Sequence, residues 1–303
     1  MRILAIDIGG TAIKSAITNE KGEVFDLREV PTEAKNGGGP AVIQRALEIA
    51  HSYSDFECIG ISTMGQVDPK KGMIVYANEN IPNYTGMQVK QIFEDEFHVL
   101  TCVENDVNCA AVGETHYGAG RGLKDLLCLT YGTGVGGAIM INRQIYGGTS
   151  GLAGEFGHLI THPNGRQCGC GQHGCYEQYA STTALVREAR RVDPRLVNGR
   201  LIFEEWNKGN IAIKMIVDDW IDEVVYGLVT LIHIFNPSGI VLGGGILAEP
   251  YIESEINRRI YKRVMQSYSD FRVMRAELKN TAGLLGASAI AFKHKITMYE
   301  REY

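Results

Sequence analysis

The stretch Ile3–Thr18, I-L-A-I-D-I-G-G-T-A-I-K-S-A-I-T, determines the fold prediction. Its apolar runs Ile3–Ile6 and Ala12–Thr18 predict two strands, joined by the glycine turn Asp7–Thr11. The pattern returns in the second half of the chain, where the apolar runs Leu126–Tyr131 and Ala138–Asn142 predict strands on either side of the turn G-T-G-V-G-G at Gly132–Gly137. A strand, a glycine turn and a second strand therefore occur twice, which predicts two α/β halves.

Strands and helices alternate after each turn, and this order favours an α/β fold. Further strands are expected at 58–62, 99–103 and 239–242. Helices are expected at about 41–53, 106–117, 181–192, 200–207, 211–235 and 282–295, and from about 250 onward. Residues 37–39 are expected to form only a loop. No low-complexity linker separates the halves, and the domain boundary is placed at the corner Glu104–Asp106.

The composition argues against several classes of function. The 303 residues have a net charge of −5 without a basic block, so nucleic acid is not an expected partner. The longest uncharged apolar run, Val224–Phe235, is too short to cross a bilayer, and no secretory signal opens the chain. Four of the seven cysteines lie singly in apolar runs, as buried thiols do. These features favour a cytoplasmic protein with reduced thiols and no membrane partner.

Three cysteines and a histidine in the segment Glu155–Glu177 have the spacing of a metal site, H-x9-C-x-C-x4-C. The ligands would be His158, Cys168, Cys170 and Cys175. Three thiolates and one imidazole form a ligand set of structural zinc, with no open coordination position. Redox-active or simply buried cysteines are the alternatives. A zinc knuckle would hold the carboxylates Glu155 and Glu177 at a pocket for vicinal hydroxyls, whereas each carboxylate alone would be surface charge.

The two glycine turns are candidate phosphate sites. Glycine lets backbone N–H groups approach phosphate oxygens, and the threonines of the turns add hydroxyl donors. The candidate residues are Gly9, Gly10, Thr11, Gly132, Thr133, Gly134, Gly136 and Gly137. Neither turn has the G-K-[ST] of a Walker motif, and the second is followed by a strand, unlike a Rossmann turn. Plain hairpin turns are the alternative.

Four further residues extend these candidate sites. Asp7 ends the first strand and could position a hydrated Mg²⁺ beside the phosphates. Lys14 could reach a phosphate or be a solvated surface lysine. Gly244 and Gly245 follow a strand and precede a helix, where they could let an adenosine group lie against the helix N-terminus. Close packing is the alternative for these two glycines.

The segment Glu104–Asp106, E-N-D, ends a strand and begins a helix. Helix capping is one interpretation of Asn105 and Asp106. In the other interpretation, Asp106 is a catalytic carboxylate at the mouth of a cleft, and the helix dipole keeps it ionised at pH 7. Such a base would orient an attacking hydroxyl and accept its proton during phosphoryl transfer.

Together these motifs resemble the ROK family (repressor, open reading frame, kinase) of sugar kinases, and the resemblance covers essentially the whole chain. The motifs are D-I-G-G-T at 7–11, E-N-D at 104–106, G-T-G-V-G-G at 132–137, G-E-F-G-H at 154–158, C-x-C-G-x-x-G-C-x-E at 168–177 and G-G-G-I at 243–246. The cysteine motif is highly specific, and the glycine turns are less so.

The resemblance implies an actin-like ATPase (ribonuclease H-like) fold with two domains around a cleft. The first domain would comprise residues 1–105, completed by a C-terminal helix at about 282–303. The second, larger domain would comprise residues 106–281 and contain the zinc-binding segment 158–175. ATP and Mg²⁺ would bind at the glycine turns, and the 6-hydroxyl of a hexose would be phosphorylated. Because family members are commonly dimers, a homodimer is expected.

The resemblance also implies the residues that bind the sugar. Asp106 would be the catalytic base. The sugar ligands would be Gly65, Asn80, Asn105, Asp106, Glu155, His158 and Glu177. His158 would bind zinc through one ring nitrogen and face the sugar with the other.

Departures from the family pattern concern the substrate. S-T-M-G at 62–65 and N-I-P-N-Y at 80–84 replace the common S-x-P-G and N-L-P-G-W. The second of these, with P-T-E-A-K at 31–35 and N-T-A-G-L-L-G-A at 280–287, is more similar to bacterial N-acetylmannosamine kinases. Glucose, N-acetylmannosamine, fructose and a β-glucoside all stay open as substrates.

Two other functions compete with sugar phosphorylation. A sugar-responsive transcriptional regulator of the same family would carry an N-terminal helix-turn-helix, but Ile3 already begins the first core strand. An actin-like structural ATPase would not need a pocket between Glu155 and Glu177. A sugar kinase is therefore the leading prediction.

Overall fold

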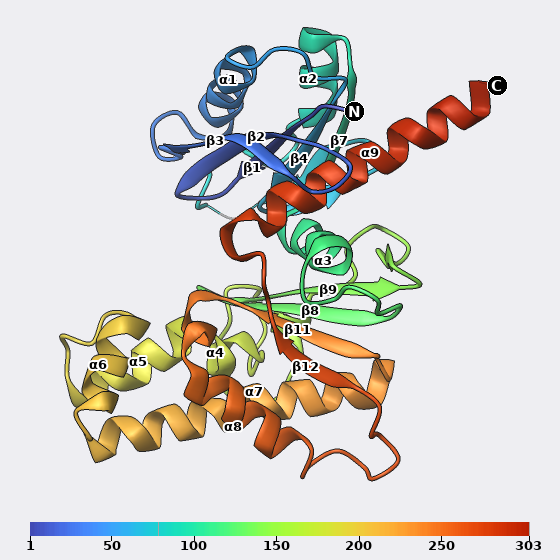
Figure 1. Cartoon of the computed structure of the whole chain (residues 1–303). Helices are drawn as coiled ribbons and strands as arrows, with labels where there is room; N and C mark the ends of the chain where they lie inside the picture. The colour runs from blue at the N-terminus through green and yellow to red at the C-terminus, as the bar shows by residue number, and fades with distance from the viewer. Residues whose placement is uncertain (78, 303) are drawn as a thin grey trace. The chain divides into compact units, whose positions relative to one another are not determined.

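The computed structural model describes residues 1–77 and 79–302, so Tyr303, the end of the expected C-terminal helix, lies outside the described residues. The chain forms two compact units (Figure 1). The first unit consists of Met1–Leu123, Ile139–Ala153 and Glu277–Tyr303, and the second of Lys124–Ala138 and Gly154–Ala276. The first unit extends beyond the corner at 104–106 where the sequence places the boundary.

The sheet of the first unit has the strand order β3-β2-β1-β4-β7. Its strands are β1 Ile3–Ile8, β2 Ala12–Thr18, β3 Val24–Pro31, β4 Cys58–Thr63 and β7 Leu100–Asn105. The strands β1, β4 and β7 are parallel to one another, while β2 and β3 are antiparallel to their neighbours. Every residue of β4 is buried, because helices cover both faces of the sheet at this strand.

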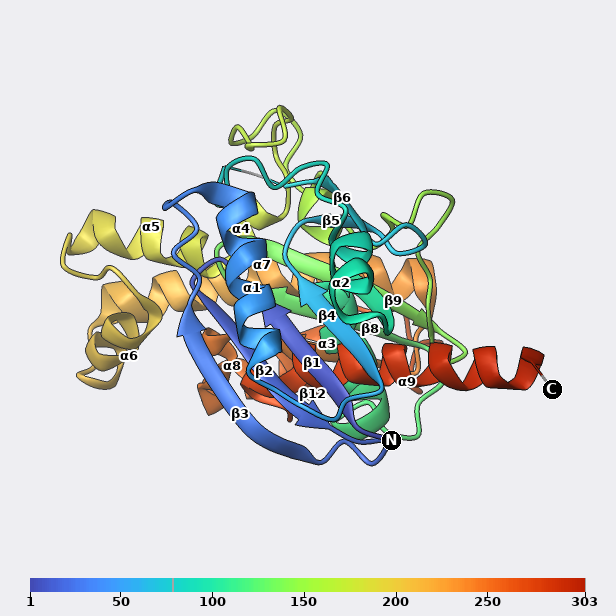
Figure 2. The ribbon, with the colours of Figure 1, turned by 90° about the horizontal axis from the view of Figure 1, so that it is seen from above.

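Two pairs of helices enclose this sheet (Figures 1 and 2). On one face lie α1 Gly38–His51 and α2 Val89–Phe97, and on the other lie α3 Asp106–Tyr117 and α9 Ala282–Glu302. The C-terminal helix packs along α3 and against β1 and β4, so a segment from the end of the chain completes the first unit. A two-stranded sheet, β5 Gln66–Asp68 with β6 Met73–Tyr76, follows β4.

The expectation that residues 37–39 form only a loop is wrong. Gly37 caps α1, and Gly38 and Gly39 form its first turn, buried against the segment Pro82–Tyr84. A Cβ atom at Gly38 would overlap the Pro82 carbonyl oxygen, and one at Gly39 would overlap that of Asn83. These glycines therefore let the helix approach a loop that the sequence assigns to sugar binding.

The second sheet repeats the plan of the first, with the order β10-β9-β8-β11-β12. Its strands are β8 Leu126–Tyr131, β9 Val135–Ile141, β10 Gln144–Ile145, β11 Gly239–Gly243 and β12 Arg272–Arg275. As in the first sheet, three strands are parallel: β8 pairs with β11, and β11 pairs with β12. The repeat of strand and glycine turn in the sequence therefore corresponds to two sheets of equal topology.

The remaining helical segments lie mainly in the second unit. They are α4 Glu177–Ala180, α5 Thr182–Val192, α6 Gly199–Asn207, α7 Ile211–Phe235 and α8 Pro250–Ile260, with single turns η1 Phe156–His158, η2 Gly245–Ala248 and η3 Lys279–Thr281. The long helix α7 packs against α4, α5, α6 and α8, and ten of its residues are buried. It is thus the central support for the segment after the cysteines.

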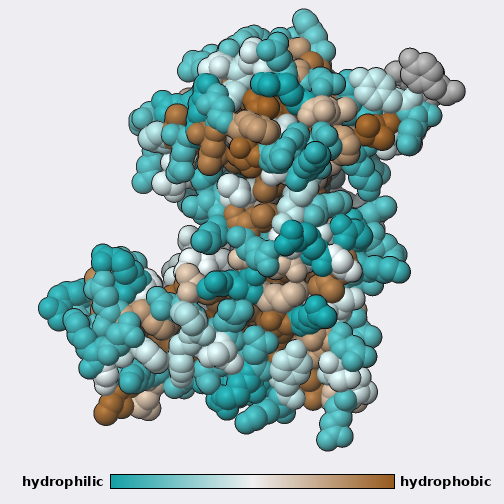
Figure 3. Space-filling model, in the orientation of Figure 1, coloured by the Kyte–Doolittle hydropathy of each residue, from teal (hydrophilic) through white to brown (hydrophobic). Residues whose placement is uncertain are grey.

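Figure 3 shows mostly hydrophilic side chains on the visible surface of each unit, with smaller apolar areas among them. Within residues 1–77 and 79–302, no helix has the length and apolar character that crossing a bilayer requires.

Candidate active site

The residues predicted for the site fall into two groups, one in each unit. The first unit contains Asp7, Gly9, Gly10, Thr11, Lys14, Gly65, Asn80, Asn105 and Asp106. The second contains Gly132, Thr133, Gly134, Gly136, Gly137, Glu155, His158, Cys168, Cys170, Cys175, Glu177, Gly244 and Gly245. The structure brings residues together within each group, and each group is described by itself.

In the first unit, polar side chains meet at the carboxyl ends of three parallel strands. Asp7 of β1 is in register with Ser62 of β4, and Ser62 with Glu104 of β7. The Ser62 hydroxyl donates a 2.6 Å hydrogen bond to Asp7 Oδ1. Burial raises the pKa of Asp7, although this bond and the charge of Lys14 oppose the shift. Ser62 was not among the predicted site residues, although it belongs to the S-T-M-G motif.

Asn105 serves both of the purposes that the sequence left open. Its Oδ1 accepts hydrogen bonds from the N–H groups of Val107 and Asn108, at 2.9 and 3.1 Å, and so caps α3. Its Nδ2 donates to Asp106 Oδ1 and to the Gly65 carbonyl, both at 2.9 Å. The amide therefore connects the start of the helix, the candidate base and the loop after β4.

Asp106 is the first residue of α3, where its Oδ1 also accepts the Val107 N–H at 2.9 Å. Burial, and then the charge of Asp7, raise the pKa of Asp106 from 3.8 to about 6, against the opposing hydrogen bonds. The carboxylate is thus ionised at pH 7, as the sequence predicts, but desolvation outweighs the hydrogen bonds at the helix N-terminus. A pKa just below neutral suits a general base.

If Asp106 is the catalytic base, as the sequence predicts, its pKa sets the acid limb of the pH–rate profile. Because only ionised Asp106 can accept a proton, kcat/KM should fall about tenfold per pH unit below about pH 6 and level off above pH 7. An unperturbed aspartate would place the limb near pH 4. Initial rates from pH 4.5 to 8.5, with fold checked by circular dichroism at each pH, measure it. A flat kcat/KM from pH 7 down to pH 5 contradicts the assignment.

The first glycine turn forms a tight hairpin. The Gly9 N–H donates to the Ala12 carbonyl at 3.0 Å, and Gly10 and Thr11 are exposed to solvent. Thr32, the residue after β3, holds the turn, because its hydroxyl donates to the Gly9 carbonyl at 2.6 Å and its N–H to the Thr11 carbonyl at 2.9 Å. The turn thus presents exposed residues on a fixed backbone.

Lys14 is half-buried and lies opposite Asp7 in the β1–β2 register. Burial raises the pKa of Asp7 and the positive charge of Lys14 opposes this rise, so the two side chains face a common region. A lysine beside this carboxylate fits the phosphate interpretation better than that of a plain surface lysine.

A left-handed glycine and a side-chain hydrogen bond shape the loops that carry Gly65 and Asn80. Gly65 has φ +94°, a left-handed conformation that favours glycine. The buried Tyr84 hydroxyl lies 2.8 Å from Thr63 Oγ1, which fixes the loop of Asn80 to the end of β4. Asn80 itself is exposed.

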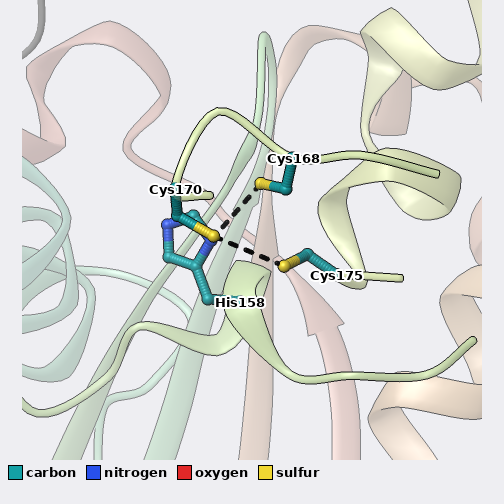
Figure 4. A group of neighbouring side chains, drawn as sticks. All are labelled: His158, Cys168, Cys170 and Cys175. Atoms are coloured by element: carbon teal, nitrogen blue, oxygen red, sulfur yellow. Dashed lines mark hydrogen bonds between the residues drawn. The ribbon is translucent and has the colours of Figure 1, made fainter. Parts of the chain in front are cut away.

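In the second unit, His158, Cys168, Cys170 and Cys175 converge (Figure 4). Their ligand atoms all lie within 4.8 Å of one another. Cys170 Sγ is 3.6 Å from Cys175 Sγ, and Cys168 Sγ is 3.8 Å from His158 Nδ1. Two sulfurs bound tetrahedrally at 2.3 Å from zinc would be about 3.8 Å apart, so the donor set fits this metal.

The two nitrogens of His158 point to different partners. Nδ1 faces Cys168, while Nε2 lies 4.0 Å from Glu155 Oε2. The one-turn helix η1 sets this arrangement, because Glu155 and His158 are three residues apart. His158 thus has one nitrogen toward the cysteine cluster and the other toward a carboxylate.

Glu177 lies between the cysteine cluster and the second glycine turn. Cys168 Sγ donates a hydrogen bond to Glu177 Oε1 at 3.1 Å. The other oxygen, Oε2, lies so close to Gly134 that a Cβ atom there would overlap it. The Glu177 carboxylate is thus close both to a predicted zinc ligand, Cys168, and to a predicted phosphate-binding glycine, Gly134.

The second turn differs in part from its prediction. The strand β9 begins at Val135, not Ala138, so Gly136 and Gly137 are strand residues. A Cβ atom at Gly137 would overlap the Phe156 ring and the Gly154 carbonyl oxygen. Gly132 and Thr133 are the exposed residues of the turn. Close packing against η1 therefore explains Gly137 independently of any phosphate.

Gly244 and Gly245 lie in two different environments. Gly244 has φ +119°, and a Cβ atom there would overlap the Tyr131 carbonyl oxygen at the end of β8. Close packing, the alternative interpretation, therefore accounts for Gly244. A Cβ atom at Gly245 would meet nothing within 4 Å, and this residue opens η2, a single turn that precedes α8.

Known relatives match almost the whole chain. A glucokinase of Streptomyces coelicolor is 33% identical over 311 residues, which cover 95% of this chain and 96% of the relative. A beta-glucoside kinase of Listeria monocytogenes is 32% identical over 294 residues, which cover 95% and 96%.

Two solved structures of sugar kinases are also similar to this chain. A ROK hexokinase from Thermus thermophilus has a TM-score of 0.87 and 33% identity, and the match covers 98% of this chain and 100% of that one. A ROK family glucokinase from Streptomyces griseus, in complex with glucose and AMPPNP, has a TM-score of 0.83 and 31% identity, with coverage of 97% and 100%. The fold and these similarities define a sugar kinase with the actin-like ATPase fold. Residues 3–294 match the ROK family, and the chain belongs to it.

Proposed function

We propose that the protein transfers the γ-phosphoryl group of ATP to the 6-hydroxyl of a hexose, with Asp106 as the base. The observation that most supports this proposal is the position of Asp106 at the start of α3, beside Asn105 and electrostatically coupled to Asp7. Relatives that match 95% of the chain are a glucokinase and a beta-glucoside kinase, which makes a hexose the expected acceptor.

The proposed reaction is an in-line displacement at the γ-phosphorus. The 6-hydroxyl oxygen attacks, its proton passes to the Asp106 carboxylate, and the bond from phosphorus to the β–γ bridging oxygen breaks as ADP leaves. The pKa of about 6 lets Asp106 accept the proton at neutral pH. Asn105 keeps the carboxylate in place through its 2.9 Å hydrogen bond.

The glycine turns and their neighbours are proposed to bind ATP. These residues are Gly9, Gly10, Thr11, Lys14, Gly132, Thr133, Gly134, Gly136, Gly137, Gly244 and Gly245. Asp7 offers the hard oxygen ligand that Mg²⁺ prefers, and it would hold the ion through water. When bound, Mg²⁺ would neutralise charge on the β- and γ-phosphates.

The sugar is proposed to bind to Gly65, Asn80, Asn105, Asp106, Glu155, His158 and Glu177. Carboxylates and amides can accept and donate in pairs, as vicinal hydroxyls require. A structural Zn²⁺ held by the three cysteines and His158 Nδ1 would fix the imidazole, so that Nε2 remains available to the sugar. The proposal includes a homodimer and a cytoplasmic location, as the sequence predicts.

An assay across a panel of sugars tests this function. ADP release, coupled to pyruvate kinase and lactate dehydrogenase, should rise above background with at least one of glucose, N-acetylmannosamine, fructose and a β-glucoside. The 6-deoxy form of the best sugar should give no ADP, because it lacks the acceptor hydroxyl. Zinc-loaded, folded protein that releases no ADP with any of these hexoses contradicts the proposal.

A further inference from the structure

Gly134 is unusual among the glycines of the second turn. Its backbone lies outside the left-handed region, so conformation alone does not require glycine. Its Cβ position is instead occupied by the Glu177 carboxylate oxygen Oε2. By contrast, a Cβ atom at Gly132, two residues earlier in the same turn, would meet nothing within 4 Å.

The atoms around Gly134 predict what a side chain would displace. Glu177 Oε2 is the end of a flexible side chain, and the next nearest atom is the Cδ of the same carboxyl group, 3.5 Å away. An alanine at 134 would therefore move the carboxylate and leave the backbone in place. At Gly137 the overlap is with the Gly154 backbone and the Phe156 ring, so an alanine there would disturb the fold itself.

The backbone around Glu177 cannot shift to relieve the overlap. Tyr176, fully buried, donates its hydroxyl to the Val224 carbonyl of α7 at 2.8 Å, and the same oxygen lies 2.9 Å from the Tyr131 hydroxyl. Thr182 Oγ1 donates to the Tyr131 carbonyl at 3.0 Å. The end of β8 and the segment 176–182 are thus fixed to each other on both sides of Glu177.

We infer that Gly134 is a positioning residue for the sugar: its missing side chain leaves the space in which the Glu177 carboxylate reaches a sugar hydroxyl. Gly134, which the sequence analysis assigns to nucleotide binding, would then also affect the affinity for the sugar. This inference rests on the proposed function, because it takes Glu177 as a sugar ligand.

The test measures hexose binding without nucleotide, by titration calorimetry on zinc-loaded protein with D-glucose, or with whichever panel sugar has the highest kcat/KM. Gly134→Ala should raise the sugar Kd about tenfold or more, as expected when a charge-assisted hydrogen bond is lost. Its melting temperature should stay within about 2 °C and its zinc content should not change. The matched variant Gly132→Ala should keep the wild-type sugar Kd.

A double variant separates this effect from general damage to the turn. If Gly134→Ala acts through Glu177, it should add nothing to the sugar Kd in a Glu177→Ala background. A wild-type sugar Kd for Gly134→Ala, or full additivity with Glu177→Ala, overturns the inference while the wild-type enzyme still phosphorylates the hexose. Wild-type protein that binds no hexose overturns the proposed function as well.

Discussion

Replacing Asp106 with alanine is expected to lower kcat for hexose phosphorylation by about 10²- to 10⁴-fold, the contribution of a general base. The half-buried carboxylate accepts hydrogen bonds from the amide of Asn105 and the N–H of Val107, and its pKa of about 6 suits proton transfer at neutral pH. Because the sugar keeps its other ligands, its KM should change much less than kcat. Steady-state ADP release with saturating sugar and ATP measures the loss.

Asp106→Asn is the matched control for folding. Desolvation raises the pKa of Asp106, so the folded state binds more protons than the unfolded state between about pH 4 and pH 6. Stability therefore falls as pH rises through this window, and the unfavourable effect is complete above pH 6. The asparagine variant keeps the hydrogen-bond acceptor without the charge and should be inactive yet more stable at pH 7, by up to about 3 kcal/mol. Full activity in either variant rules out the proposed base.

The sequence predicts most of the central strands because they are continuous apolar runs. The strands β1, β4, β8 and β11 are buried between layers and lie within one or two residues of their expected limits. The edge strand β3, by contrast, contains charged and exposed residues and ends in proline, so no apolar pattern marks it.

Short helices that bury few residues are also not predicted by a hydrophobic sequence pattern. The helix α2 buries only Val89 and Phe93, and its N-cap residue Gln88 makes no side-chain hydrogen bond to the helix. The edge strand β12 is similar, since only Val273 of its four residues is buried. Packing against a sheet, rather than local preference, forms such elements.

The candidate site shows the same division between local motifs and tertiary contacts. The cysteine spacing alone predicts a cluster that the structure forms, because the four ligands lie within a short segment. Contacts between distant segments were not predictable: Ser62 and Asp7 are 55 residues apart, and Gly134 and Glu177 are 43 apart. Glycine in a turn can serve a phosphate or a neighbouring side chain, and only the packing distinguishes the two.

Removing the metal should weaken sugar binding and stability together. In Cys170→Ser, a hard hydroxyl replaces one thiolate of the predicted zinc set, so zinc content should fall well below one per chain. A zinc knuckle would position His158 through Nδ1, and Glu177 through the backbone, because Glu177 follows the ligand Cys175 by two residues, so the sugar KM should rise about tenfold or more. Zinc analysis, thermal unfolding and kinetics on the same preparation test this result.

The comparison that decides this prediction is with Cys58→Ser, which changes a buried cysteine of the first unit that does not belong to the cluster. That variant should lose stability, because a hydroxyl replaces a thiol in an apolar core, but keep its zinc content and sugar KM. Chelation of the wild-type protein should reproduce the raised sugar KM of Cys170→Ser, and added Zn²⁺ should reverse it. An unchanged sugar KM after verified zinc loss would mean that the tertiary contacts of Tyr176, not the metal, position Glu177 for the sugar.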